Sequence, residues 1–106
     1  MPRQNRLFMR NLIKRPLARQ DLKGIWVYTY KQWGERQADA YLLDMNEALI
    51  ALAQNPKLGH TIEHPTPDLR QYRYKKHLII YLHDENTLEI VRVLHQRMDI
   101  SRHTVQ

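Results

Sequence analysis

Cysteine is missing from the 106-residue sequence. A chain without cysteine forms no disulfide framework, binds no metal through thiolates and carries no cysteine nucleophile. The absence also fits a reducing compartment, so we expect a cytoplasmic protein. A domain of this length buries enough apolar surface to fold without cross-links. We therefore expect one domain over residues 1–106, with residues 1–6 as a frayed extension.

Glycine and long apolar runs are also scarce. With 3 glycines, the sequence has no Gly-rich phosphate loop and no G-x-S-x-G nucleophile turn. The longest apolar run, residues 78–82, is far shorter than the roughly 20 residues of a membrane-spanning helix. Arg10 interrupts the short apolar stretch near the amino terminus, so the sequence does not predict a signal peptide. We expect no cofactor and no membrane partner.

Acidic residues are fewer than basic ones. The sequence has 11 Asp and Glu and 17 Lys and Arg, which gives a net charge of +6. The first 36 residues hold nine basic side chains against Asp21 and Glu35. Such an excess favours acidic partners, either nucleic acid or an acidic protein segment. Charge alone does not choose between them.

The first half of the chain predicts a strand and two helices. Loosely alternating apolar residues over 7–13 predict an edge strand that Pro16 ends. Pro16 suits the first turn of a helix that Gly34 ends. A second apolar stripe runs from Glu35 to Asn55, and the short connection forces an antiparallel helical hairpin.

The aromatic residues of the first helix divide between two faces. Trp26 and Trp33 fall on its apolar stripe, so we expect both in the core. Tyr28 and Tyr30 fall off the stripe and are expected at the surface.

The second half predicts a loop and three strands. The loop spans Lys57 to Asp68, and the strands are Leu69–Lys75, His77–His83 and Thr87–His95. The order β-α-α-β-β-β predicts an α+β fold with the hairpin packed on one face of an antiparallel sheet.

Both faces of the last two strands are apolar. In the third strand Leu78, Ile80 and Leu82 alternate with Ile79 and Tyr81. In the fourth, Leu88, Ile90 and Leu94 alternate with Val91 and Val93. The hairpin covers one face, so the other either lies under the termini and loops or faces a partner, and we favour a partner.

One motif suggests a metal. His60-Thr-Ile-Glu-His64 matches the H-x-x-E-H pattern of a class of zinc peptidase, in which a helix carries both histidines. Gly59 and Pro65 flank it and leave no room for that helix. We therefore expect a polar loop and no metal. The strand-end histidines His77, His83 and His95 are further candidates for a cluster.

Two stretches carry candidate binding residues. The first is a basic strand with interleaved tyrosines, typical of an RNA-stacking sheet or of a surface for an acidic amphipathic peptide. Its residues are Arg70, Tyr72, Arg73, Tyr74, Lys75 and Lys76, with Tyr81 nearby. The second is the polar exit of the last strand, His95 to Asp99, where an Arg92–Asp99 ion pair would pin the tail to the sheet.

The sequence resembles the ParE-type toxins of the RelE/ParE superfamily. The motifs that carry the resemblance run from Leu17 to His103; they are Leu17-Ala-x-x-Asp-Leu22 with Ile25-Trp26, Trp33-Gly-Glu35, Gln37-Ala-Asp39, Asn55-Pro-x-Leu-Gly59, Asp68-Leu-Arg70, His77-x-Ile-x-Tyr81 and Arg92-Val-Leu-His-x-Arg-Met-Asp99. The resemblance implies a helical hairpin on a curved antiparallel sheet. It also implies a toxin that inhibits DNA gyrase and is neutralised by a ParD-like antitoxin.

Under this resemblance, the candidates for gyrase contact are Arg92, His95, Arg97 and Met98. The candidates for antitoxin contact are Arg70, Tyr72, Arg73, Tyr74, Ile79 and Tyr81. An acidic antitoxin tail would be attracted by the charge of +6 and would bury its apolar side chains on the sheet.

Related RelE-type toxins are ribosome-dependent mRNA endoribonucleases, and this activity is the alternative. The catalytic residues would then come from Arg73, Lys75, His95 and Arg97, with His77 and Arg92 nearby. No tyrosine follows Arg97. We therefore favour a non-enzymatic toxin, without direct sequence-specific binding of nucleic acid.

Overall fold

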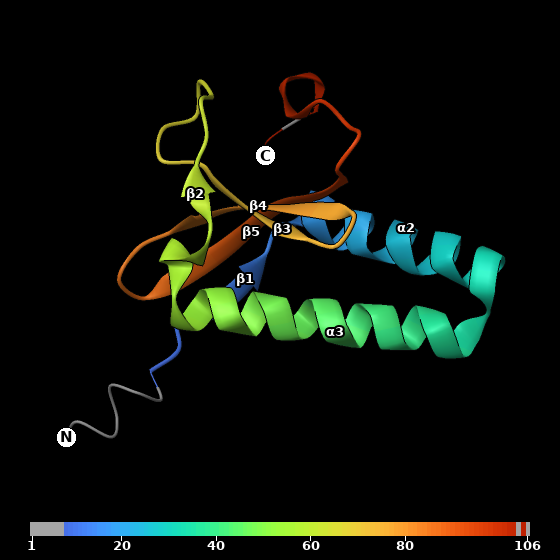
Figure 1. The fold of residues 1–106 in the computed structure, drawn as a ribbon. Helices are drawn as coiled ribbons and strands as arrows, with labels where there is room; N and C mark the ends of the chain where they lie inside the picture. The colour runs from blue at the N-terminus through green and yellow to red at the C-terminus, as the bar shows by residue number, and fades with distance from the viewer. Residues whose placement is uncertain (1–7, 104, 106) are drawn as a thin grey trace.

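The computed structural model describes residues 8–103 and residue 105. Its elements follow the predicted order, with one additional short strand and two 3₁₀ turns (Figure 1). They are β1 Asn11–Lys14, α2 Pro16–Trp33, α3 Glu35–Gln54, η1 Pro56–Leu58, β2 His60–Thr61, β3 Arg70–Tyr74, β4 His77–His83, β5 Thr87–His95 and η2 Ile100–Arg102. The expected extension, residues 1–6, lies outside the described residues.

Five strands form one sheet in the order β1-β5-β4-β3-β2. The predicted antiparallel pairing is confirmed for β3, β4 and β5. Strand β2, within the segment expected as a loop, also pairs antiparallel with β3. Strand β1, however, runs parallel to β5, from Asn11 opposite Thr87 to Lys14 opposite Ile90. The predicted edge position of β1 is confirmed, although the strand begins at Asn11, later than predicted. The sheet is therefore mixed, because the amino-terminal strand pairs with the carboxy-terminal one.

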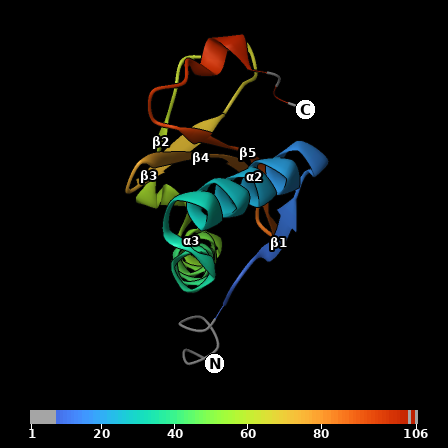
Figure 2. The same ribbon diagram turned by 90° about the vertical axis from the view of Figure 1, so that its right-hand side faces the viewer.

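The helical hairpin packs on one face of the sheet, as predicted (Figures 1 and 2). Gly34 alone links the helices and has a φ of 93°, a conformation that side chains other than glycine rarely adopt. Beneath the hairpin lies the larger core, which includes Met45, Leu49, Leu52, Ile79 and Tyr81. No helix in the described ranges is long and apolar enough to cross a membrane.

The hairpin extends beyond the sheet, so part of its apolar stripe is uncovered (Figure 1). Trp33 is 67% exposed, and its expected place in the core is wrong because it lies in the last turn of α2. Trp26 is half-buried, and its indole N–H donates to Asp39 at 2.9 Å. The expected exposure of Tyr28 and Tyr30 is confirmed.

The opposite face of the sheet is covered by the chain itself. Leu69, Ile80 and Val91 are fully buried there, packed partly by Ile100 and Val105 of the tail. Figure 2 shows the tail and the loop before β3 on the side of the sheet away from the hairpin. The expectation that this face is open to a partner is therefore wrong for these core positions.

A β-bulge in β5 changes which residues share a face. The pairing steps from Ile80–Arg92 to Tyr81–Ile90, which leaves Val91 as the extra residue. Val93 consequently packs with the hairpin core, whereas Val91 packs on the opposite face. Simple alternation had placed both valines on one face.

Asp21 of α2 joins the hairpin to the edge of β5. Its carboxylate accepts two hydrogen bonds from the Arg92 guanidinium, at 2.7 and 2.9 Å, and one from the Val93 N–H at 3.0 Å. The predicted Arg92–Asp99 pair is therefore wrong. Asp99 instead caps η2 by accepting from the N–H and hydroxyl of Ser101.

Replacing Asp21 with Ala should lower the free energy of unfolding by about 2–4 kcal/mol, because a largely buried guanidinium and a strand-edge N–H lose their acceptor. Urea denaturation of both proteins measures the difference. Arg102→Ala removes an exposed ion pair with Asp99 and serves as the matched control, with no measurable change expected. Equal stability of the Asp21→Ala and Arg102→Ala proteins would contradict the assigned role of Asp21.

Candidate functional site

A cluster of aromatic and basic side chains lies where the β3–β4 turn meets the exit of β5. In the sheet register, His77 pairs with Tyr74 on one side and with His95 on the other. The Tyr41 hydroxyl reaches in from α3 and shares a 2.7 Å hydrogen bond with His77 Nδ1. The rings of His77 and His95 meet edge to face, with their centroids 5.5 Å apart.

The interior of this cluster is electrically neutral near pH 7. Burial, reinforced by His95, lowers the pKa of His77 to about 4. Burial also raises the pKa of Tyr41, with a further contribution from Tyr74. Lys75 supplies a cation at the surface, with its Nζ about 5.5 Å from the centres of both tyrosine rings. Because its pKa is about 4, His77 is a weak base near pH 7.

Three of the four candidates for gyrase contact lie in or directly after this cluster, because His95 belongs to it and Arg97 and Met98 follow in the next turn. The N–H of Arg97 donates to His95 Nδ1 at 3.1 Å, which shapes the turn out of β5. Arg97 and Met98 are exposed, and His95 is half-buried. The fourth candidate, Arg92, differs from them because its guanidinium is bound to Asp21.

The candidates for antitoxin contact divide into core and surface residues. Ile79 and Tyr81 are fully buried beneath the hairpin, so their expected role as surface contacts is wrong. The Tyr81 hydroxyl donates to the Pro56 carbonyl and accepts from the Gly59 N–H. The remaining candidates lie on β3, with Arg70, Tyr72 and Tyr74 half-buried and Arg73 exposed.

The candidates for catalysis are partly brought together. The His95 ring contacts the His77 ring, and the Lys75 ammonium lies over the Tyr74 ring. The Arg73 Nε–H donates to the Lys75 carbonyl at 2.9 Å. Tyr41 was missed, because its position on an apolar helical stripe predicts only a core residue. No pattern in the sequence indicates that the hairpin carries it to His77.

The remaining histidines do not form a metal site. His60 lies on β2 and His64 in the following loop, so the helix required by the H-x-x-E-H motif is replaced by extended chain. No group of three or more potential metal ligands occurs within residues 8–103 and 105. His83 lies at the end of β4 opposite to His77, so the strand-end histidines form a pair and not a trio.

Stability should fall as the pH is lowered from about 6.5 to 4. The pKa of His77 is about 4 in the folded chain against 6.5 for an unperturbed histidine, so the unfolded chain takes up the proton first. Above pH 6.5 this effect is absent. The urea midpoint at pH 7, 6, 5 and 4 measures the loss, which should become smaller in His77→Gln. His60→Gln, at an exposed position, should retain the full loss; the same loss in both variants would contradict this origin.

The sequence matches the family of the ParE toxin of the type II toxin–antitoxin system parDE over residues 12–100. It is 39% identical over 88 residues to Toxin ParE1 of Mycobacterium tuberculosis, covering 82% of this chain and 90% of that protein.

Two solved structures share the fold. The chromosomal ParDE toxin–antitoxin system of P. aeruginosa superposes with a TM-score of 0.70 at 19% identity, covering 82% of this chain and 96% of the other. The RelBE2 toxin–antitoxin complex of Mycobacterium tuberculosis superposes with a TM-score of 0.58 at 20% identity, covering 83% and 99%.

Proposed function

This chain belongs to the ParE toxin family of type II toxin–antitoxin systems, and we propose from that premise that it inhibits DNA gyrase and is neutralised by a ParD-like antitoxin. The observation that carries the proposal is the 39% identity to Toxin ParE1, which extends over most of both chains. The toxin acts by stabilising the complex of gyrase with cleaved DNA, as the family resemblance implies.

The geometry at the exit of β5 disfavours His77 as a general base and exposes Arg97 and Met98 for a protein contact. The Nδ1 of His77 is engaged by Tyr41, and the lowered pKa of this ring makes it a poor general base near pH 7. Arg97 and Met98 are exposed on a turn that His95 shapes. An exposed cation beside an apolar side chain is suited to a protein contact.

The antitoxin contact is proposed for β3. Arg73 is exposed there on the sheet face opposite to Tyr72 and Tyr74, which are half-buried against the hairpin core, and the chain carries a net charge of +6. Arginine and tyrosine are frequent anchors of protein interfaces. A ParD-like partner is supported by the ParDE system among the related structures.

Purified toxin should cause cleaved plasmid to accumulate when it is incubated with gyrase and supercoiled DNA, and detergent should trap the product. The double variant Arg97→Ala/Met98→Ala should lower this accumulation at least tenfold, because it removes both exposed contacts of the turn. Arg102→Ala, on the same tail, is the control and should retain the effect. Full activity of the double variant would place the gyrase contact elsewhere.

Arg73→Glu should weaken antitoxin binding by about tenfold or more, because the new carboxylate would repel the acidic antitoxin segment that Arg73 is proposed to bind. Arg36→Glu changes the net charge equally at an exposed site on the hairpin and should have little effect. Calorimetric titration with the cognate antitoxin measures both affinities. Equal losses would show that net charge, and not β3, governs the association.

An endoribonuclease is the second candidate, favoured by the proximity of Lys75, His77 and His95 at one end of the sheet. In that case His95 acts as the base and a neighbouring cation holds the phosphate. Translating ribosomes supplied with the toxin decide between the candidates. Site-specific cleavage of mRNA that is lost in His95→Ala would replace the gyrase proposal.

A further inference from the structure

Four basic side chains meet at the other end of β4, away from the His77 cluster. Arg10 precedes β1, Lys57 lies in η1, Arg70 begins β3 and His83 ends β4. Arg10, Lys57 and Arg70 form no ion pair with the residues that the structure describes. Because the four come from distant parts of the sequence, only the fold brings them together.

Backbone carbonyls hold the two guanidinium groups in place. The Arg10 Nε–H donates to the Asp84 carbonyl at 2.6 Å, directly after His83. The Arg70 Nη2 donates to the Gly59 carbonyl at 2.7 Å. A Cβ at Gly59 would overlap the Tyr81 hydroxyl and the Gln71 carbonyl, so glycine is required for this close approach. Both guanidinium groups are therefore oriented before any ligand binds.

Two polar atoms at this corner have no hydrogen-bond partner among the residues that the structure describes. They are the buried Arg70 Nε and His83 Nδ1, and such unpaired buried polar groups are unusual. Burial lowers the pKa of His83, and the charges of Arg10, Arg70 and Lys57 lower it further. All three cations therefore lie close enough to His83 to act on it.

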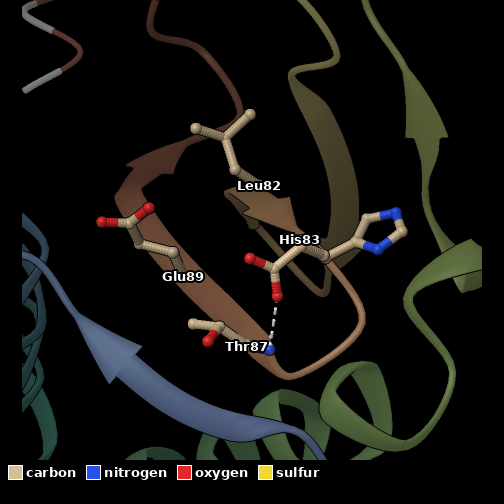
Figure 3. Close-up of a pocket in the computed structure, with 5 residues that line it drawn as sticks. Leu82, His83, Thr87 and Glu89 are labelled. Atoms are coloured by element: carbon tan, nitrogen blue, oxygen red, sulfur yellow. Dashed lines mark hydrogen bonds between the residues drawn. The ribbon is translucent and has the colours of Figure 1, made fainter.

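The acidic residues nearby are engaged elsewhere. Asp84 accepts the N–H groups of Asn86 and Thr87 inside the β4–β5 turn, each at 2.8 Å. Glu89 forms an ion pair with Arg15. Figure 3 shows the His83 ring turned away from Glu89 and Leu82, which line the small pocket beside this turn. The Asp84 carboxylate is near enough for Arg10 and His83 to contribute to its lowered pKa, after the N–H groups of Asn86 and Thr87, but it forms no ion pair with the cluster in the described ranges.

We propose that Arg10, Lys57, Arg70 and His83 form a binding site for a backbone phosphate of nucleic acid. Two guanidinium groups anchored on different elements match the oxygens of a tetrahedral phosphate, which point in several directions. A carboxylate has two coplanar oxygens, which one guanidinium satisfies. A small rotation of the His83 ring then gives its Nδ1 a partner. A phosphate contact does not depend on the base sequence. This site is also distinct from the surface proposed to act on gyrase.

Inorganic phosphate is the first probe, followed by NMR of the whole chain. Saturable shifts are expected for the Arg10 and Arg70 Nε–H signals and for the His83 ring. The exposed side chains of Arg19 and Arg36 are internal controls and should not shift. Equal shifts for all arginines, or none, would overturn the site.

Labelled duplex DNA and RNA of the same sequence are the second probe, with binding measured against salt concentration. Lys57→Gln should weaken binding and reduce the salt slope by about 1. Lys23→Gln removes the same charge from an exposed position on α2 and should leave the slope unchanged. The nucleic acid that binds more tightly identifies the source of the phosphate.

Three outcomes would overturn the proposal. Equal effects of Lys57→Gln and Lys23→Gln would assign binding to net charge. Binding of inorganic phosphate but of neither nucleic acid would leave an adventitious ion only. A lower melting temperature of Lys57→Gln with unchanged affinity would show that the cations serve the carbonyl end of α3. None of these measurements requires gyrase, so the result is independent of the proposed function.

Discussion

The contact of Asp21 with β5 fixes the relation between the hairpin and the sheet. Strand β1 pairs with β5 only as far as Ile90, and beyond it Asp21 accepts the Val93 N–H at the strand edge. The same carboxylate binds the Arg92 guanidinium. A helix thereby continues the hydrogen bonding that a strand began. Because α3 follows α2 after a single residue, this contact also decides where Tyr41 meets the sheet.

The two ends of β4 differ in their electrostatics. At one end His77 is neutral near pH 7 because burial and the neighbouring His95 lower its pKa to about 4. At the other end His83 is kept neutral by burial and by the three cations around it. The first arrangement lies beside the exposed turn that follows β5. The second produces a concentration of positive charge, and one strand therefore separates two surfaces of different chemistry.

Coverage of the second sheet face limits where partners bind. The chain's own loop and tail bury Leu69, Ile80 and Val91. The apolar side chains of β4 and β5 therefore pack mainly within the folded chain. The accessible features are the β3 edge region, the turn after β5 and the tip of the hairpin, where Trp33 and Tyr28 are exposed.

The sequence by itself determined the elements that depend on local rules. Pro16 and Gly34 set the ends of α2, and the β-branched runs set β4 and β5 at the predicted bounds. It also predicted the ParE family, because the order and spacing of the family's motifs can be read directly from the sequence. Most of the candidate site followed in the same way, since Tyr74, Lys75, His77 and His95 lie at or beside the ends of adjacent strands.

Only the tertiary structure decided the rest. The parallel pairing of β1, the partner of Arg92, the burial of Tyr81 and the approach of Tyr41 to His77 all join segments that are distant in sequence. Periodicity reports which face of an element is apolar, but not which element covers it. The bulge at Val91 shows the limit most clearly, because one extra residue reverses the faces of a strand without changing its pattern.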